Sequence, residues 1–319
     1  MPDSEVNAEM TTVANLSSDD HLISETLISS REPKSDLADN QCVSPSVNQN
    51  VIESLSTSLT SASVTSIPVT TSSSAITEKT AIDDSNTSDL KEIATLVFFD
   101  LETTGLGYFV GKSNVQITEI SMIAVDKKEF QISNYPDLRD VRIIHKLSLC
   151  VRPRSPISPM AAKITGLNDS NLEGQQPFDQ NAAQMIISFL SHLQKPVCIL
   201  AHNGGTFDYP LLKAEFKRLA LELPLDLRIA DSLYGMRSVG IPELPFDQKP
   251  TKAVIFKNGR LSLSLENLHV YFFGKKPYGS HSSEGDCITL AKICHKMRDK
   301  LLPWVDKHSK SFDTVKPMW

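Results

Sequence analysis

The stretch "TLVFFDLETTGL", residues 95–106, decides how the chain folds. Its first part, Thr95–Asp100, is a run of apolar and β-favouring residues, which predicts a central strand buried on both faces. Asp100 and Glu102 stand at the end of that strand. Because side chains alternate along a strand, both carboxylates are expected to project from the same face.

These two acids are the first candidate for a metal site. Two anions side by side raise each other's pKa unless a cation lies between them, and Mg²⁺ prefers carboxylate oxygen. A D-x-E pair is common by chance, and surface acids at a strand end are the simpler interpretation. The apolar strand before the pair and the loop "TTGL" after it favour the metal site, since loop N–H groups could meet a substrate.

The flanking sequence predicts an α/β domain. Strands at Val115–Val125 and His145–Val151 are expected to form an antiparallel meander with the first. Strand and helix patterns then alternate, and residues 236–262 are predicted to be a mobile loop or small hairpin. The order favours a mixed sheet with helices on both faces. The further strands predicted are Val197–Ala201 and Arg228–Leu233, and the helices are Ser158–Ile164, Gln180–Leu193, Tyr209–Leu219, Ser264–Phe273 and Ser283–Lys300.

Composition divides the chain near residue 90. Residues 1–90 contain no aromatic residue and no glycine, 31 of them are Ser or Thr, and their net charge is −11, whereas the remainder carries +5. A segment without aromatics has little apolar surface to offset the entropy of ordering. We therefore expect a disordered acidic tail over 1–90, a folded domain over 91–305 and a C-terminal tail over 306–319. The basic remainder suits a phosphate-rich partner.

The rest of the composition points to a soluble intracellular protein. The five cysteines are odd in number and form no C-x-x-C pair, so a reducing compartment, cytoplasmic or nuclear, is expected. Acidic residues near the N-terminus fit neither a secretory nor a transit peptide. Apolar runs stay short of the ~18 residues that a membrane span needs.

Asp208 is the second candidate, in "CILAHNGGTFDYPLL", residues 198–212. This segment predicts a strand, a loop of small residues and the start of a helix. Asp208 would lie at or near the N-cap, and capping alone is the simpler interpretation. Gly204–Gly205 favour a role in a site, since paired glycines let a backbone approach a ligand closely.

His281 and Asp286 form the third candidate, in "HSSEGD". Asp286 falls in the first turn of the last predicted helix and His281 in the loop before it, with Gly285 expected to keep the joint flexible. A fixed carboxylate suits a metal ligand, and neutral imidazole can take a proton from water. The simpler interpretation is an exposed histidine and an aspartate favoured by the helix dipole.

In this order, the three motifs resemble the DEDDh exonuclease family, which is named for its four acidic residues and its histidine. "FFDLETTGL", "AHNGGTFDYPLL" and "HSSEGD" are similar to the three-prime repair exonucleases in particular. The segments "KLSLCVRP" at Lys146–Pro153 and "ITGL" at Ile164–Leu167 share that similarity. The resemblance covers residues 92–305 and none of the N-terminal segment.

The resemblance implies a ribonuclease H-like fold with a five-stranded mixed sheet, a homodimer, and action on DNA 3′ ends that are single-stranded or frayed. It also implies two Mg²⁺ ions per site, replaceable by Mn²⁺, which would activate a water and stabilise the leaving 3′-oxygen. His281 would be the general base, and nucleoside 5′-monophosphates would be released in DNA repair or degradation. The implied metal ligands are Asp100, Glu102, Asp208 and Asp286.

The resemblance further implies a set of residues against the substrate. Thr103 and Leu106 would lie against the terminal nucleotide, Ile164 beside its base and Phe207 near the active centre, and Glu102 and His281 would also touch the substrate. Two features depart from the family. Gly205–Thr206–Phe207 replaces the usual Asp-Arg-Tyr before the third acid, and residues 236–262 differ in length and charge.

Two other functions share parts of this evidence. An RNA 3′-exonuclease would use the same chemistry and would differ in whether its pocket accepts a 2′-hydroxyl. A non-catalytic nucleic-acid-binding relative could keep the fold. The presence of all four acids and the histidine disfavours this last interpretation.

Overall fold

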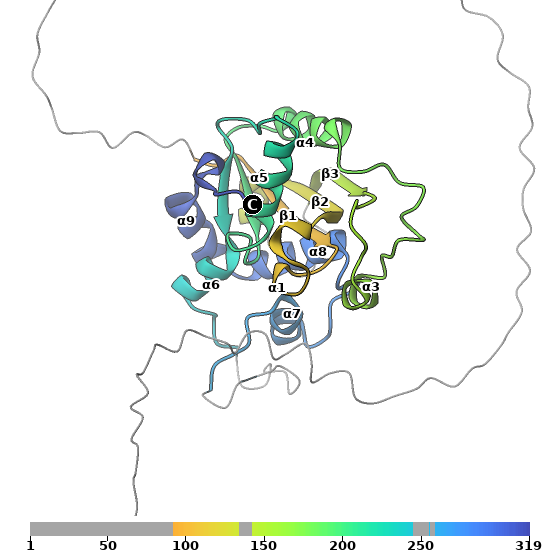
Figure 1. Ribbon diagram of the computed structural model, residues 1–319. Helices are drawn as coiled ribbons and strands as arrows, with labels where there is room; N and C mark the ends of the chain where they lie inside the picture. Colours follow the sequence, from red (N-terminus) through yellow and green to blue (C-terminus); the bar gives the residue numbers. More distant parts are fainter. Residues whose placement is uncertain (1–91, 134–141, 245–254, 256–258) are drawn as a thin grey trace, which may run out of the picture. The chain divides into compact units, whose positions relative to one another are not determined.

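The computed structural model describes residues 92–133, 142–244, 255 and 259–319, and Figure 1 shows the course of the chain. The predicted disordered tail at 1–90 lies outside the described residues. So do residues 245–254 and 256–258 of the predicted loop at 236–262.

A six-stranded mixed sheet forms the centre of the domain, in the order β3-β2-β1-β4-β5-β6. The mixed topology is confirmed: β1 pairs antiparallel with β2 and parallel with β4, and the β2–β3 pair is antiparallel. The strands are β1 Thr95–Thr103, β2 Ile117–Asp126, β3 Ile143–Cys150, β4 Val197–Ala201, β5 Arg228–Asp231 and β6 Lys310–Ser311.

The sixth strand is a correction to the predicted five. β6 is two residues long and pairs with β5 through Ser311 and Lys310. Phe312, directly after it, is buried, so packing continues through the segment 306–319 that was predicted to be a tail. A two-residue strand has no alternation that a sequence pattern could show.

Helices cover both faces of the sheet (Figure 1). α6 begins where the predicted strand Arg228–Leu233 was expected to continue, and the predicted helix Ser283–Lys300 is divided into α8 and α9 at Met297. The helices are α1 Gly107–Val110, α2 Lys127–Ile132, α3 Pro159–Thr165, α4 Gln180–His192, α5 Asp208–Arg218, α6 Ser232–Val239, α7 Leu265–Phe273, α8 Ser283–Lys296 and α9 Arg298–His308.

β1 is buried on both faces, as its sequence predicts. Val97 and Phe99 pack in the core cluster that includes residues of α4 and α5, whereas Leu96 and Phe98 pack in the cluster that includes residues of α8 and α9. Asp100 and Glu102 continue the alternation of Leu96 and Phe98, so they leave the sheet on the side of α8. Among the described residues, no helix combines the length and the hydrophobicity that crossing a bilayer would require.

Candidate metal centre

The end of β1 and the first turn of α8 bring three carboxylates together. Asp100, Glu102 and Asp286 each offer an oxygen, and these oxygens lie within 4.8 Å of one another. The Sγ of Cys287, the next residue of α8, lies 3.4 Å from the carbonyl oxygens of Phe98 and Ser121, so the turn rests directly on β1 and β2. Three converging hard oxygen donors fit a divalent cation such as Mg²⁺.

Asp208 lies beside this group. It is buried, and its charge helps to raise the pKa of Asp100. Asp208 is the first residue of α5, while the N-cap position is taken by Phe207 and has no side-chain cap bond. Asp208 therefore lies next to the N-cap, near the predicted position, and not at it. The structure thus brings all four predicted acids to one end of the sheet, three of them within 4.8 Å.

Burial and mutual repulsion raise the pKa values of these acids. The pKa of Asp100 is raised well above its usual value, first by burial and then by the charges of Asp208, Asp286 and Glu102. Burial followed by repulsion from Asp286 raises the pKa of Glu102 to about 8. Burial is also the main cause that raises the pKa of Asp208 to about 7 and that of Asp286 to about 6. Such a group favours a cation that neutralises it.

His281 is exposed in the loop before α8, as predicted, and it contacts the acid group through its backbone. Its N–H donates to Oδ2 of Asp286 at 3.1 Å, and its φ of 64° lies in the left-handed region. Gly285 has a different role from the predicted flexible joint. A side chain there would collide with the carbonyl group of Gly279, so glycine allows the loop to pack against the helix.

The loop before Asp208 is held by Asp231, a residue that the sequence did not single out. Its carboxylate accepts the N–H groups of Asn203 at 3.1 Å and Gly205 at 2.9 Å, and it also caps α6. Gly204 is required by close packing, because an added side chain would meet Ala201. Asp231 ends β5 directly before α6, whereas the predicted strand continued to Leu233 and no helix was expected after it, so the sequence pattern did not mark this residue.

Glu119 is a second residue that the sequence did not single out. It lies on β2 opposite Glu102, and Ser121 lies opposite Asp100. The register then shifts so that Thr103 faces Ile117, which makes Thr118 the extra residue of a bulge. In the sequence, the only sign of this bulge was the break in the period-two pattern of apolar residues near Thr118.

Besides Glu102 and His281, four residues were predicted to lie against a substrate, and they differ in how far they are exposed. Leu106 and Ile164 are 46% and 42% exposed, which is unusual for large apolar side chains. Thr103 is buried and donates its hydroxyl to the Gly105 carbonyl at 3.2 Å, and Phe207 packs partly against the core. Two of the four therefore offer apolar surface to a ligand.

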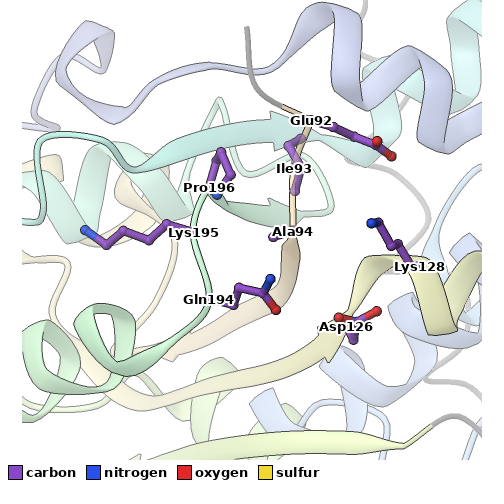
Figure 2. A pocket seen from close by; sticks show the side chains of 8 residues that line it. All are labelled: Glu92, Ile93, Ala94, Asp126, Lys128, Gln194, Lys195 and Pro196. Atoms are coloured by element: carbon purple, nitrogen blue, oxygen red, sulfur yellow. The ribbon is translucent and has the colours of Figure 1, made fainter.

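A separate pocket of about 280 Å³ lies at the opposite end of β1 (Figure 2). It is far along the strand from Asp100 and Glu102 and is therefore distinct from the acid group. Its lining residues are Glu92, Ile93, Ala94, Asp126, Lys128, Gln194, Lys195 and Pro196.

The geometry agrees with the comparison with known proteins. The exonuclease family model (RNase_T) matches residues 97–294, and the chain belongs to this family. Within the family it is similar to three-prime repair exonuclease 1 of Homo sapiens, with 36% identity over 234 residues, which are 70% of each chain. It is 34% identical to three prime repair exonuclease 2 of Mus musculus over 70% of this chain and 92% of that protein. The resemblance inferred from the motifs is confirmed.

A solved structure of exonuclease I has the same fold. The TM-score is 0.50 with 22% identity, and the match covers 67% of this chain and 44% of that one. The chain therefore corresponds to less than half of that structure. This likeness supports the predicted ribonuclease H-like arrangement of a mixed sheet with flanking helices.

Proposed function

We propose that the protein is a metal-dependent 3′-to-5′ exonuclease that releases nucleoside 5′-monophosphates from DNA 3′ ends in DNA repair or degradation. One observation carries the proposal: Asp100, Glu102 and Asp286 converge within 4.8 Å with buried Asp208 beside them. Its relatives are named three-prime repair exonucleases. Removal of a nucleotide by hydrolysis is the reaction for which such a group of carboxylates is suited.

The four acids would hold two divalent ions, Mg²⁺ or Mn²⁺. Bound there, the ions would lower the pKa of a water and stabilise the leaving 3′-oxygen. Asp286 accepts the His281 backbone N–H at 3.1 Å and so fixes the loop from which the imidazole would reach the site. His281 would accept the proton of the attacking water.

The substrate would enter as a single-stranded or frayed 3′ end. The exposed side chains of Leu106 and Ile164 would contact the terminal nucleotide and its base, because both offer apolar surface to a base ring. Thr103 and Phe207 would lie on the inner side of the same contact surface. Thr206, exposed where the family has arginine, leaves that contact to other residues.

Degradation of matched single-stranded DNA, duplex DNA and RNA, each with and without Mg²⁺, tests the proposal. We expect Mg²⁺-dependent shortening of single-stranded DNA from the 3′ end, with 5′-monophosphates as products. Glu284→Gln is a matched control, because Glu284 lies in the same turn as Asp286 but pairs with Lys146 at 2.8 Å. Faster degradation of the RNA would instead support the RNA exonuclease, and cleavage of none of the three would contradict the proposal.

A homodimer is part of the proposal. β3 is the last strand of the sheet on its side, and Ile143 and Ile144 expose apolar side chains on it. An unpaired edge strand can pair with a second copy. Light scattering of the full chain should give about twice its 35.2 kDa mass, and a monomer at micromolar concentration would refute the dimer.

An intracellular location, cytoplasmic or nuclear, completes the proposal. Four of the five cysteines lie in the part of the chain that the structure describes, and all four are free thiols. Free thiols are typical of a reducing compartment. Imaging of the tagged full chain would test this location.

A further inference from the structure

Ser283, the first residue of α8, is held at two points by β2. Oε2 of Glu119 accepts the Ser283 backbone N–H at 3.0 Å, and the Ser283 hydroxyl donates to Oγ of Ser121 at 2.8 Å. Glu119 and Ser121 are two residues apart, so they leave the same face of the strand. One face of β2 therefore fixes both the backbone and the side chain of this residue.

The N–H that Glu119 accepts has no partner within the helix. The first N–H groups of a helix point away from it without an intrahelical acceptor. The hydroxyl of Ser282, the N-cap, accepts the N–H of Gly285 at 3.2 Å, which leaves the N–H of Ser283 to a residue outside the helix. A carboxylate at this position also complements the partial positive charge of the helix N-terminus. Glu119 thus caps α8 from a different element.

The capped turn carries one of the acids of the candidate metal centre. Asp286 is three residues beyond Ser283, its carboxylate approaches those of Asp100 and Glu102, and it accepts the N–H of His281. Glu102 is the direct partner of Glu119 in the pairing of β1 with β2. The position of this one hydrogen bond is therefore linked to the spacing between the acids of β1 and the acid of α8.

We propose that Glu119 is a positioning residue of the metal centre: by accepting the Ser283 N–H, it sets the distance of Asp286 from the β1 acids. The proposal rests on the proposed function, since it concerns the same site. No metal-ligand role is assigned to Glu119. Its contribution is the hydrogen bond, which the amide oxygen of glutamine can also accept.

Glu119 could instead affect the metal centre through its negative charge, and this explanation can be tested separately from the hydrogen bond. After burial and the repulsion of Asp286, the Glu119 carboxylate helps to raise the pKa of Glu102. A role through charge would be lost in both Glu119→Gln and Glu119→Ala. A role through the hydrogen bond would be lost only in Glu119→Ala.

The test compares these two variants of the full chain with the parent and with Glu284→Ala. Glu284 is the residue after Ser283, and its half-exposed carboxylate pairs with Lys146, so its loss removes an acid from the same turn without touching the cap. The measurements are Mn²⁺ binding by calorimetry, and kcat and KM for single-stranded DNA at saturating Mg²⁺. We expect Glu119→Ala to lose about 10–100-fold in Mn²⁺ affinity and kcat, the range found when partners of metal ligands are removed, with little change in KM. Glu119→Gln and Glu284→Ala should stay near the parent.

Several outcomes would overturn the proposal. Parent-like Mn²⁺ affinity and kcat in Glu119→Ala would show that the cap does not position the site, and equal losses in Glu119→Gln and Glu119→Ala would assign the effect to charge. Should Glu119→Ala fail to fold, Glu119→Met takes its place, because it keeps the length of the side chain and removes the acceptor: losses like those expected of Glu119→Ala support the role, and parent-like values contradict it. A parent that binds Mn²⁺ while these variants contradict the role leaves the metal centre standing, whereas a parent that binds none overturns both.

Discussion

The two ends of β1 both hold charge that is buried or partly buried, and they compensate it differently. Near the start of the strand, Lys127 is 1% exposed and pairs with Glu92 at 2.9 Å and Asp306 at 2.8 Å. At the other end, Asp100 and Glu102 meet further acids of the same sign. Buried charges that are paired can be tolerated as part of the fold, whereas buried charges of one sign need a partner from outside.

The pKa values show the same difference. Burial alone would lower the pKa of the Lys127 ammonium, but its hydrogen bonds to Asp306 and Glu92 more than offset this, and the pKa is raised. The charged form of Lys127 is therefore favoured by the fold. At the acid end, burial and repulsion both raise the pKa, so the charged forms are disfavoured until a cation binds.

Removal of one acid should have the largest effect and sharpen this contrast. We expect Asp100→Asn to abolish nuclease activity, because a ligand is lost, while the melting temperature in EDTA stays unchanged or rises, because a disfavoured buried charge is lost. Nuclease assays and calorimetry would measure both. A variant that keeps most of the activity, or that melts many degrees lower, would break the comparison.

Removal of His281 tests the proton transfer without changing the acids. His281→Ala should cut single-stranded DNA on the order of 10²–10⁴-fold more slowly, the usual cost of losing a general base. Binding of Mn²⁺ and of a DNA 3′ end should remain close to that of the parent. Near-parent cleavage would make His281 an ordinary loop residue.

The opposite end of β1 should show the reverse pattern. Lys127→Met keeps the apolar part of the side chain and removes the ammonium group. We expect the free energy of unfolding to fall by about 1.5–3 kcal/mol, the usual contribution of a hydrogen bond to a charged group. The nuclease rate per folded molecule should not change. Lys128→Met, at the exposed neighbour, is the matched control, and equal stability of the two variants would contradict a compensated buried charge.

The acid end of β1 also predicts a pH dependence of the metal-free stability. The folded pKa values of about 8 for Glu102, 7 for Asp208 and 6 for Asp286 exceed the unfolded values near 4. Between these limits the folded chain binds more protons than the unfolded chain. Its stability therefore falls as the pH rises from about 4 to 8.

Thermal melting in EDTA and in Mg²⁺ would measure this effect. Because bound Mg²⁺ replaces the protons, the gain in melting temperature from Mg²⁺ should be larger at pH 8 than at pH 5.5. Two results would argue against like charges buried together. One is a melting temperature that does not respond to Mg²⁺, and the other is a melting temperature in EDTA that rises between about pH 4 and 8.

The sequence was sufficient for the features that depend on local pattern. The apolar run at residues 95–100 predicted the buried strand, and its alternation predicted that Asp100 and Glu102 share a face. The start of α8 placed Asp286 in its first turn. These predictions succeeded because each depends on the geometry of a single element.

The remaining features depend on contacts between distant segments. The bond between Glu119 and Ser283 joins residues 164 positions apart, so no local pattern could show which N–H the carboxylate accepts. The break between α8 and α9 at Met297 interrupts an apolar pattern that continues through Leu301. β6 is held by its pairing with β5 rather than by any preference of its own.

The central claim is that the acid end of β1 works only when a divalent cation compensates it. The most direct measurement is cleavage of a single-stranded DNA 3′ end by the EDTA-treated protein, before and after Mg²⁺ is added in excess. The metal-free protein should leave the DNA intact, and Mg²⁺ should restore stepwise removal of nucleotides in the parent but not in Asp100→Asn. Cleavage that persists in EDTA, or that Asp100→Asn retains, would contradict the claim.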